Sequence, residues 1–142
     1  MIVYRMHRTG IDALDSAGSF LSEGRWHTAG TRVIYTAQHV SLAALETLIH
    51  ASGGRISGRQ LTEIMIPGEL AIETAEWREK PESQRFGDSW AKAKKTAVLR
   101  VPSIAVNKLE WNYIINPLHG DFGRIQKGRI RGFVFDERFF KQ

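Results

Sequence analysis

The stretch that decides the fold is residues 24–50, GRWHTAGTRVIYTAQHVSLAALETLIH. Its first residues are rich in glycine, threonine and alanine and predict a loop. The apolar run at 32–37 predicts a short strand, and the leucine spacing over 42–51 predicts a helix for which Ser41 is the expected N-cap. The apolar stripe of this helix is expected to comprise Leu42, Leu45, Leu48 and Ile49. A loop, a strand and a helix therefore follow one another in this one stretch.

Each of these three pieces carries one polar residue that packing alone does not require. Arg25 stands in the loop beside Gly24, where a guanidinium suits an anionic group. Tyr35 lies in the strand, where its ring can contact a flat ligand. Glu46 borders the apolar stripe, and a carboxylate in that place is partly desolvated and needs a partner. The plainer interpretations are a surface arginine, an aromatic residue at the core edge and a glutamate that contacts His50 one helical turn later.

The rest of the chain predicts more strands than helices. Strands are expected at 2–8, 61–66, 70–74, 97–101, 113–115 and 130–135. A short helical turn is expected around 12–17, within a long loop over 9–31. After a loop at 77–86, Asp88 is the expected N-cap of a short helix over 89–95. Because the strands do not alternate regularly with helices, the pattern favours a single mixed α+β domain over a doubly wound parallel sheet.

Length and composition set further limits. The chain has 142 residues, 42% of them hydrophobic and 25% charged, which is typical of one domain with its own core. No apolar run approaches the roughly 20 residues of a membrane span, and the first ten residues do not predict a signal peptide. The absence of cysteine suits a reducing cytoplasm and excludes thiolate chemistry. The five histidines have no metal-ligand spacing, so no metal site is expected.

The charge balance suits an anionic ligand or an acidic partner, and it suits solubility alone equally well. Lys and Arg number 20 and Asp and Glu 15, so the net charge is +5 at pH 7. A nucleic-acid-binding module is the alternative from another class. Against it, the sequence shows no helix-turn-helix, no RNP-like strand and no one-sided basic helix, and its densest basic stretches are 92–95 and 124–131. No standard nucleotide-binding loop is present either.

Taken in order, these residues resemble the RES domain, a family named for its Arg, Glu and Ser residues. The resemblance is carried by Gly24-Arg25-Trp26-His27, Tyr35-Thr36-Ala37, Ser41-Leu42-Ala43 with Glu46 and His50, Gly87-Asp88 with Trp90, Val101-Pro102-Ser103, Asn116-Pro117 with His119 and Asp121, and Phe135-Asp136 with Phe139. It spans essentially the whole chain, residues 1–142, as one domain. One departure is Glu23, where many members carry a second glycine.

The resemblance implies a fold, a reaction and partners. The implied fold is similar to the ADP-ribosyltransferase core, a split and mostly antiparallel sheet with flanking helices. RES domains are toxins of type II toxin–antitoxin pairs, partnered by an Xre-family antitoxin. They cleave the nicotinamide–ribose bond of NAD⁺, which is a substrate, and no further cofactor is implied. We also expect inorganic phosphate as an acceptor, a homodimer inside a larger toxin–antitoxin complex and a cytoplasmic location.

The resemblance also implies which residues act. The expected catalytic residues are Arg25, Tyr35, Glu46 and Ser103, and the expected substrate contacts are Arg25, Trp26, Tyr35, Ser103 and Asn116. Glu46 is expected to stabilise positive charge on the ribose, Tyr35 to orient nicotinamide and Arg25 to hold a phosphate. Hydrolysis, phosphorolysis and transfer of ADP-ribose to a protein all stay open, as does a chain that only binds a partner.

Overall fold

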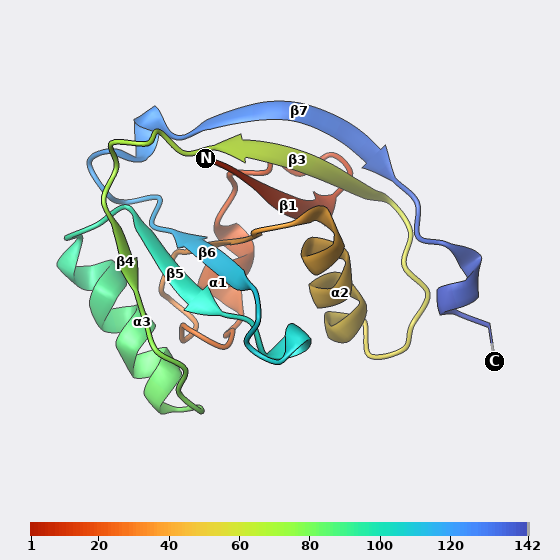
Figure 1. Cartoon of the computed structure of the whole chain (residues 1–142), viewed down its shortest axis with the longest axis horizontal. Coiled ribbons are helices and arrows are strands. Elements are labelled where there is room, and N and C mark those ends of the chain that lie inside the picture. The colour runs from red at the N-terminus through yellow and green to blue at the C-terminus, as the bar shows by residue number, and fades with distance from the viewer. Residues whose placement is uncertain (142) are drawn as a thin grey trace.

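Residues 1–141, the part of the chain that the structure describes, form one seven-stranded sheet in the order β4-β5-β6-β2-β1-β3-β7 (Figure 1). In this computed structural model the strands are β1 (Ile2–Arg8), β2 (Ile34–Ala37), β3 (Arg59–Met65), β4 (Ile72–Thr74), β5 (Val98–Pro102), β6 (Trp111–Ile115) and β7 (Gln126–Phe133). The α-helices are α1 (Ala17–Leu21), α2 (Val40–His50) and α3 (Glu82–Ala93), and the 3-10 turns are η1 (Ile104–Val106), η2 (Phe122–Arg124) and η3 (Glu137–Phe139). Neighbouring strands are antiparallel, apart from β4 and β5. The predicted mixed α+β domain is confirmed.

The sheet is nearly divided between β1 and β2. Strand β1 pairs with β3 along its whole length, whereas β1 and β2 share one pair, Tyr4 opposite Ala37. The two halves of the sheet therefore part on either side of this pair, and Figure 1 shows the strands β1, β3 and β7 diverging from β4, β5 and β6. Helix α2 packs against β1 and β2 and against η1. This is the split sheet that the resemblance implies.

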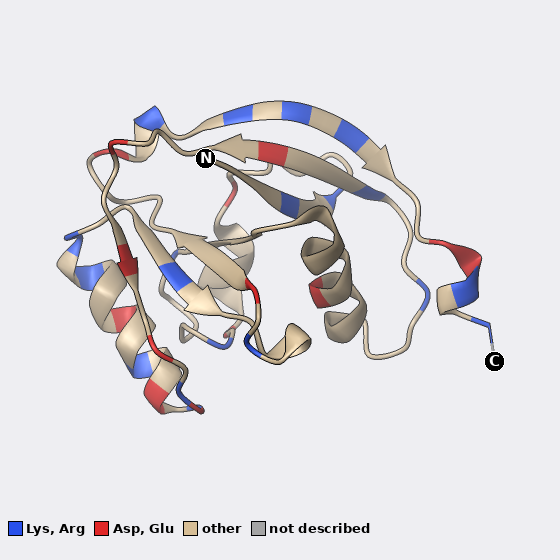
Figure 2. Ribbon diagram, viewed as in Figure 1, with Lys and Arg blue, Asp and Glu red and all other residues tan. Residues whose placement is uncertain are grey.

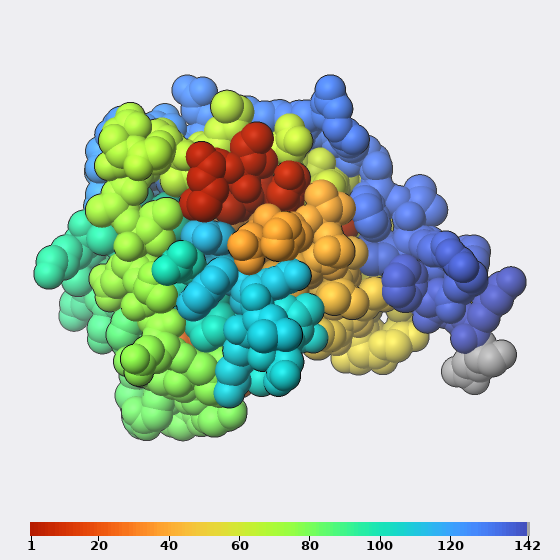
Figure 3. All heavy atoms as spheres, in the orientation of Figure 1, coloured from red at the N-terminus to blue at the C-terminus, as the bar shows by residue number. Residues whose placement is uncertain are grey.

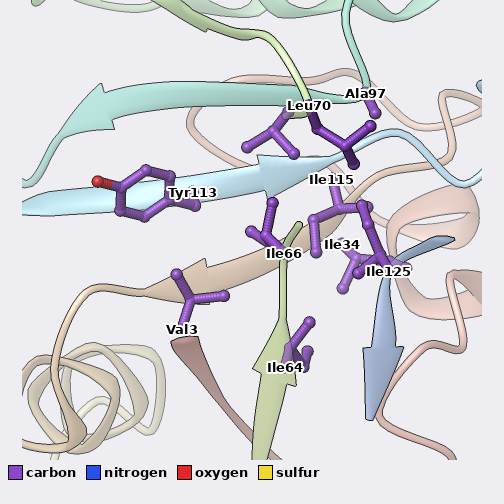
Figure 4. Close-up of a cluster of buried hydrophobic side chains, with 10 residues drawn as sticks. Val3, Ile34, Ile64, Ile66, Leu70, Ala97, Tyr113, Ile115 and Ile125 are labelled. Carbon is purple, nitrogen blue, oxygen red and sulfur yellow. The ribbon is translucent and has the colours of Figure 1, made fainter. Parts of the chain in front are cut away.

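The main hydrophobic core joins the two halves of the sheet. Its buried side chains are Val3, Ile34, Ile64, Ile66, Leu70, Ala97, Val98, Tyr113, Ile115 and Ile125 (Figure 4). Complete burial of one large aliphatic side chain contributes about 1.5–3 kcal/mol. Because side chains alternate along a strand, Val3 enters this cluster, whereas Tyr4 and Met6 of the same strand pack with Leu42 of α2. One face of β1 therefore packs into the main core, and the other face packs against α2.

Helix α2 differs from its prediction in its N-cap and in its buried face. It begins at Val40 with His39 as N-cap, and no side chain caps it, so Ser41 is not the N-cap. Of the expected stripe, Leu42 is fully buried, but Leu45 and Ile49 are 37% and 57% exposed. The reason is that the face of α2 that meets β1, β2 and η1 is centred on Leu42 and its buried neighbour Ala43.

Helix α3 corrects the prediction for the middle of the chain. It begins at Glu82 inside the expected loop, and Asp88 lies within the helix instead of capping it. Pro81 occupies the N-cap position. A proline is tolerated there because the backbone N–H that it lacks would form no hydrogen bond within the helix. The buried residues of α3 are Ser83, Gln84, Gly87, Trp90 and Ala91, at helical spacing. Most of these buried residues are polar or small, so the sequence has no apolar stripe from which the helix could be predicted.

Two further elements lie elsewhere than predicted. Strand β7 begins at Gln126 instead of residue 130, because it is an edge strand on which Lys127, Arg129 and Arg131 can remain exposed (Figure 2). Charged side chains on an edge strand oppose pairing with other chains. The short turn expected around 12–17 forms over residues 12–15, where the Asp15 N–H donates to the Asp12 carbonyl at 3.0 Å, but helix α1, which begins at Ala17, lies where a loop was expected. No helix within residues 1–141 has both the length and the hydropathy that crossing a membrane requires.

Candidate active site

A cavity of about 280 Å³ opens where the two halves of the sheet part, with Tyr4 and Ala37 of the joining pair in its lining. This volume is close to the lower end of the range for small-molecule pockets, about 300–1,000 Å³. The other walls come from the 24–26 loop, from α2 and from the end of β5 with η1. In Figure 3 the cyan segment around η1 packs beside the orange segment that contains the start of α2. The four expected catalytic residues all line this cavity: Arg25, Tyr35, Glu46 and Ser103.

Glu46 and Ser103 form the wall on the side of α2, which we call the helix wall. The Ser103 hydroxyl, which follows β5 directly, donates a hydrogen bond of 3.1 Å to Oε1 of Glu46. Ser103 is 1% exposed, whereas Glu46 is partly exposed to the cavity. A carboxylate can accept about four hydrogen bonds, so acceptor capacity remains for a ligand. His50 donates to the backbone carbonyl of Glu46 at 2.7 Å and not to its carboxylate.

Tyr35 and residues 23–28 form the opposite side, which we call the loop wall. The Tyr35 hydroxyl accepts the backbone N–H of Trp26 at 3.1 Å and lies 2.7 Å from Nδ1 of His27. Burial raises the pKa of the Tyr35 hydroxyl well above its ordinary value, and the charges of Asp88 and Glu46 act in the same direction. The phenol is therefore neutral at any pH near 7.

Helix α3 holds the loop wall through its polar buried face. The Ser83 hydroxyl donates to the carbonyl of Arg25 at 2.5 Å, and the Gln84 amide donates to the carbonyl of Gly24 at 3.0 Å. The Asp88 carboxylate accepts two bonds from Thr28, at 3.0 Å from its N–H and 2.6 Å from its hydroxyl. The buried face of α3, which no apolar stripe predicted, therefore positions the loop that carries Arg25.

Gly87 of α3 lies directly against the loop backbone. A Cβ atom at Gly87 would lie 1.7 Å from the carbonyl oxygen of Trp26, so only glycine permits this close approach. Glu23, the departure from the family pattern, also contacts α3: its carboxylate accepts from Gln84 at 3.1 Å and lies 3.6 Å from Nζ of Lys80. The Gln84 bond and the Lys80 charge lower the pKa of Glu23. Glu23 therefore ties the start of the loop to α3.

Arg25 reaches the mouth of the cavity between an aromatic ring and an acid. Its guanidinium lies 5.0 Å from the ring centre of Trp77 and 3.7 Å from the carboxylate of Glu79. Both charged side chains are well exposed, at 38% and 77%, so water screens this ion pair and makes it weak. Nζ of Lys108 lies 5.3 Å from the same Trp77 ring. The sequence predicted a loop from residue 77 and gave no signal for the place of Trp77 in this wall.

Of the remaining expected substrate contacts, Trp26 borders the cavity, whereas Asn116 lies outside its lining. The Trp26 residue is 2% exposed, and its indole packs edge-on against Trp77 and Phe86, with ring centres 6.5 and 6.1 Å apart. Asn116 is 1% exposed and lies outside the lining of the cavity. Its amide donates to the carbonyl of Ala91 at 2.9 Å and thus joins the end of β6 to α3.

Sequence reasoning missed other lining residues, among them Thr47 and Asn112. Thr47 follows Glu46 on the same helix, so helical spacing could have found it, whereas only strand pairing brings Asn112 of β6 here. Within residues 1–141, no group of three or more His, Asp or Glu side chains could hold a metal ion. The four expected catalytic residues bring a cation, a phenol, a carboxylate and a hydroxyl to the cavity.

A mostly antiparallel split sheet whose parting halves enclose these four groups defines a single-domain α+β protein with a small-molecule cavity at the split. The family profile of the RES domain matches residues 2–136, and the chain belongs to this family. Family membership confirms the resemblance drawn from the sequence.

Two relatives match over almost their whole length. The chain is 35% identical to the Prs ADP-ribosylating toxin of Sphingobium sp. (strain YBL2) over 145 residues, which covers 92% of this chain and 89% of that protein. It is 33% identical to Toxin Res of Photorhabdus laumondii over 154 residues, covering 99% and 98%. A chain in the crystal structure of the M. tuberculosis MbcT–MbcA toxin–antitoxin complex has a similar fold, with a TM-score of 0.75 and 15% identity over 94% of this chain and 84% of that one.

Proposed function

We propose that this protein is the toxin of a type II toxin–antitoxin pair and that it cleaves the nicotinamide–ribose bond of NAD⁺. The observation that carries the proposal is the meeting of Arg25, Tyr35, Glu46 and Ser103 in one cavity at the split of the sheet. Membership of the RES family and relatives that are named as toxins support it.

The reaction requires charge stabilisation more than acid catalysis. The C–N bond breaks with its electron pair moving to the ring nitrogen, so nicotinamide leaves as a neutral molecule that needs no proton. The ribose acquires oxocarbenium character, as in other glycosyl transfers. Water then bonds to C1 and releases a proton to the solvent, or an anionic oxygen of inorganic phosphate bonds to C1 without releasing one. Glu46, held by Ser103, supplies a carboxylate beside the developing positive charge.

The other residues bind and orient the substrate. Arg25 binds a phosphate, either of NAD⁺ or of inorganic phosphate as acceptor, by exchanging its weak contact with Glu79 for this ligand. The Tyr35 ring contacts the nicotinamide, and Ser103 holds the carboxylate of Glu46 towards the ribose. A cavity of about 280 Å³ admits the nicotinamide–ribose half, while the adenosine half extends over the cavity mouth beside Trp77.

A second candidate function is transfer of ADP-ribose to a protein. It is favoured by the relative named Prs ADP-ribosylating toxin, at 35% identity. The bond that breaks is the same, and a nucleophilic side chain of the target protein replaces water or phosphate at C1. The four residues serve both reactions.

The proposal extends to partners and location. We expect an antitoxin of the Xre family to bind this chain, and the net charge of +5 suits acidic groups on that partner. NAD⁺ is the substrate and no further cofactor takes part. A homodimer within a larger toxin–antitoxin complex and a cytoplasmic location belong to the same proposal.

The test follows NAD⁺ concentration over time with the purified chain, with and without phosphate, beside Arg25→Ala and Glu46→Ala. Loss of NAD⁺ with the wild type alone supports the proposal, and dependence on phosphate selects phosphorolysis over hydrolysis. If a folded wild-type chain leaves NAD⁺ unchanged, labelled NAD⁺ with cell-extract proteins tests for transfer. No loss and no transfer would overturn both candidate functions.

A further inference from the structure

The His27 imidazole forms its hydrogen bond to the cavity lining through Tyr35. Its imidazole is 2% exposed and is not part of the cavity lining. Nδ1 lies 2.7 Å from the Tyr35 hydroxyl, and Nε2 lies 2.9 Å and 2.8 Å from the carbonyl oxygens of Ser19 and Ser22. The chemistry of NAD⁺ cleavage described above gives this buried ring no task.

The two carbonyl groups decide which nitrogen of His27 carries the hydrogen. Carbonyl oxygens only accept, so Nε2 is the donor, and a neutral imidazole then keeps a lone pair on Nδ1. The hydrogen-bond partners of the ring are all uncharged, and the Glu23 carboxylate acts on it only at longer range, so no direct counter-charge offsets the cost of burying an imidazolium. Nδ1 is therefore an acceptor and the Tyr35 hydroxyl is its donor.

This assignment determines what the Tyr35 hydroxyl can offer a ligand. Its proton is bound to His27, and one lone pair accepts the N–H of Trp26 at 3.1 Å. One lone pair remains. The side chains of Tyr35 and His27 pack directly against Gly24, where a Cβ atom would lie 2.7 Å from the Tyr35 oxygen and 2.9 Å from Nδ1 of His27. Gly24, Trp26, His27 and Tyr35 thus form one hydrogen-bonded unit.

We infer that His27 is a positioning residue that accepts the hydrogen bond donated by the Tyr35 hydroxyl. Tyr35 therefore meets the substrate as a hydrogen-bond acceptor and not as a donor. The inference rests on the proposed function. The matching ligand group is an N–H or O–H donor, which NAD⁺ carries in its carboxamide and in its ribose hydroxyls. A leaving group that departs neutral needs no proton from Tyr35, so this role agrees with the chemistry.

Two substitutions of His27 separate its two hydrogen bonds. In His27→Gln the amide nitrogen takes the place of Nε2 and donates to the carbonyls, but no acceptor faces Tyr35. In His27→Asn the side-chain oxygen takes the place of Nδ1 and accepts from Tyr35, but the carbonyls of Ser19 and Ser22 lose their donor. His39→Gln, at an exposed histidine outside the cavity, is the matched control.

The readouts are kcat/KM for NAD⁺, Tm and the imidazole ¹⁵N shifts. We expect His27→Gln to lower kcat/KM about tenfold with a Tm near that of the wild type, and His27→Asn to lower Tm while keeping the larger part of the rate. Tyr35→Phe and the double variant His27→Gln/Tyr35→Phe should have equal rates, because His27 acts through Tyr35. The ¹⁵N spectrum should show a hydrogen on Nε2 and a lone pair on Nδ1.

Several results would overturn the inference. They are a protonated Nδ1, equal rate losses in both His27 variants, or losses that multiply in the double variant. The ¹⁵N spectrum does not depend on turnover. A wild-type chain that leaves NAD⁺ intact but shows the expected tautomer would therefore contradict the proposed function and leave the proton assignment of the Tyr35–His27 pair standing.

Discussion

The loop wall and the helix wall of the cavity are built in opposite ways. Helix α3 and Tyr35 bond several backbone groups of residues 23–28, so that the loop has many contacts that keep it in place. On the helix wall, one bond from Ser103 holds the carboxylate of Glu46. A wall with many bonds keeps one geometry and suits substrate positioning. A carboxylate with one bond keeps acceptor capacity and suits a charge that develops during the reaction.

The largest expected effect is on the helix wall. Glu46→Gln keeps the shape of the side chain and an oxygen that can accept from Ser103, but removes the negative charge. We expect NAD⁺ consumption to fall about 10²–10³-fold, with a Tm close to that of the wild type. Glu76→Gln, at an exposed glutamate outside the cavity, is the control. A fully active Glu46→Gln enzyme would place the essential charge elsewhere.

The second prediction breaks the loop wall through α3. Gly87→Ala forces a methyl group against the carbonyl of Trp26, which must shift. We expect the free energy of unfolding in urea to fall by about 1–3 kcal/mol, as for other overpacked sites, and the activity to fall with it. Gly120→Ala meets open space and is the control. Equal stabilities of the two variants would show that the loop moves away from α3 without cost.

A third experiment compares two hydroxyl groups, that of Ser83, which holds the loop wall from α3, and that of Ser103, which belongs to the helix wall. Ser83→Ala leaves the carbonyl of Arg25 without its bond from α3, and we expect a loss of about 1–3 kcal/mol in the free energy of unfolding. Ser103→Ala releases Glu46, and we expect about tenfold slower NAD⁺ consumption with a smaller change in stability. Urea unfolding and initial rates measured on both variants test the division of tasks. The reverse pattern, with rate lost at Ser83 and stability at Ser103, would refute it.

The smallest expected effect concerns the mouth of the cavity. Glu79→Gln removes the acid that holds Arg25, and exposed ion pairs contribute about 0.2–1 kcal/mol. We expect KM for NAD⁺ to fall by no more than about fivefold at low salt, and the difference to shrink as salt screens the charges. Glu82→Gln, which breaks the exposed pair with Arg85, is the control. A rise in KM would indicate that Glu79 itself contacts the substrate.

Local sequence signals predicted β1, β2 and α2 well, because strand alternation and helical spacing depend on near neighbours. They failed for α3, whose buried face carries Ser83 and Gln84 in place of an apolar stripe. Such a face is buried because it bonds the loop 58 to 60 residues away in sequence. The site followed the same division: the ordered motifs predicted Arg25 and Glu46, whereas nothing local indicated Trp77.

By itself, the sequence determined the α+β class, the order of the elements and the set of polar residues available for chemistry, since composition and short-range periodicity suffice for these. Only the tertiary structure decided that the sheet parts at the pair Tyr4–Ala37, that Ser103 meets Glu46 from 57 residues away, and that Asn116 joins β6 to α3. These contacts depend on which strands pair and which faces meet once the whole chain has closed on its core. Long-range packing sets that outcome, and no short segment of the chain contains it.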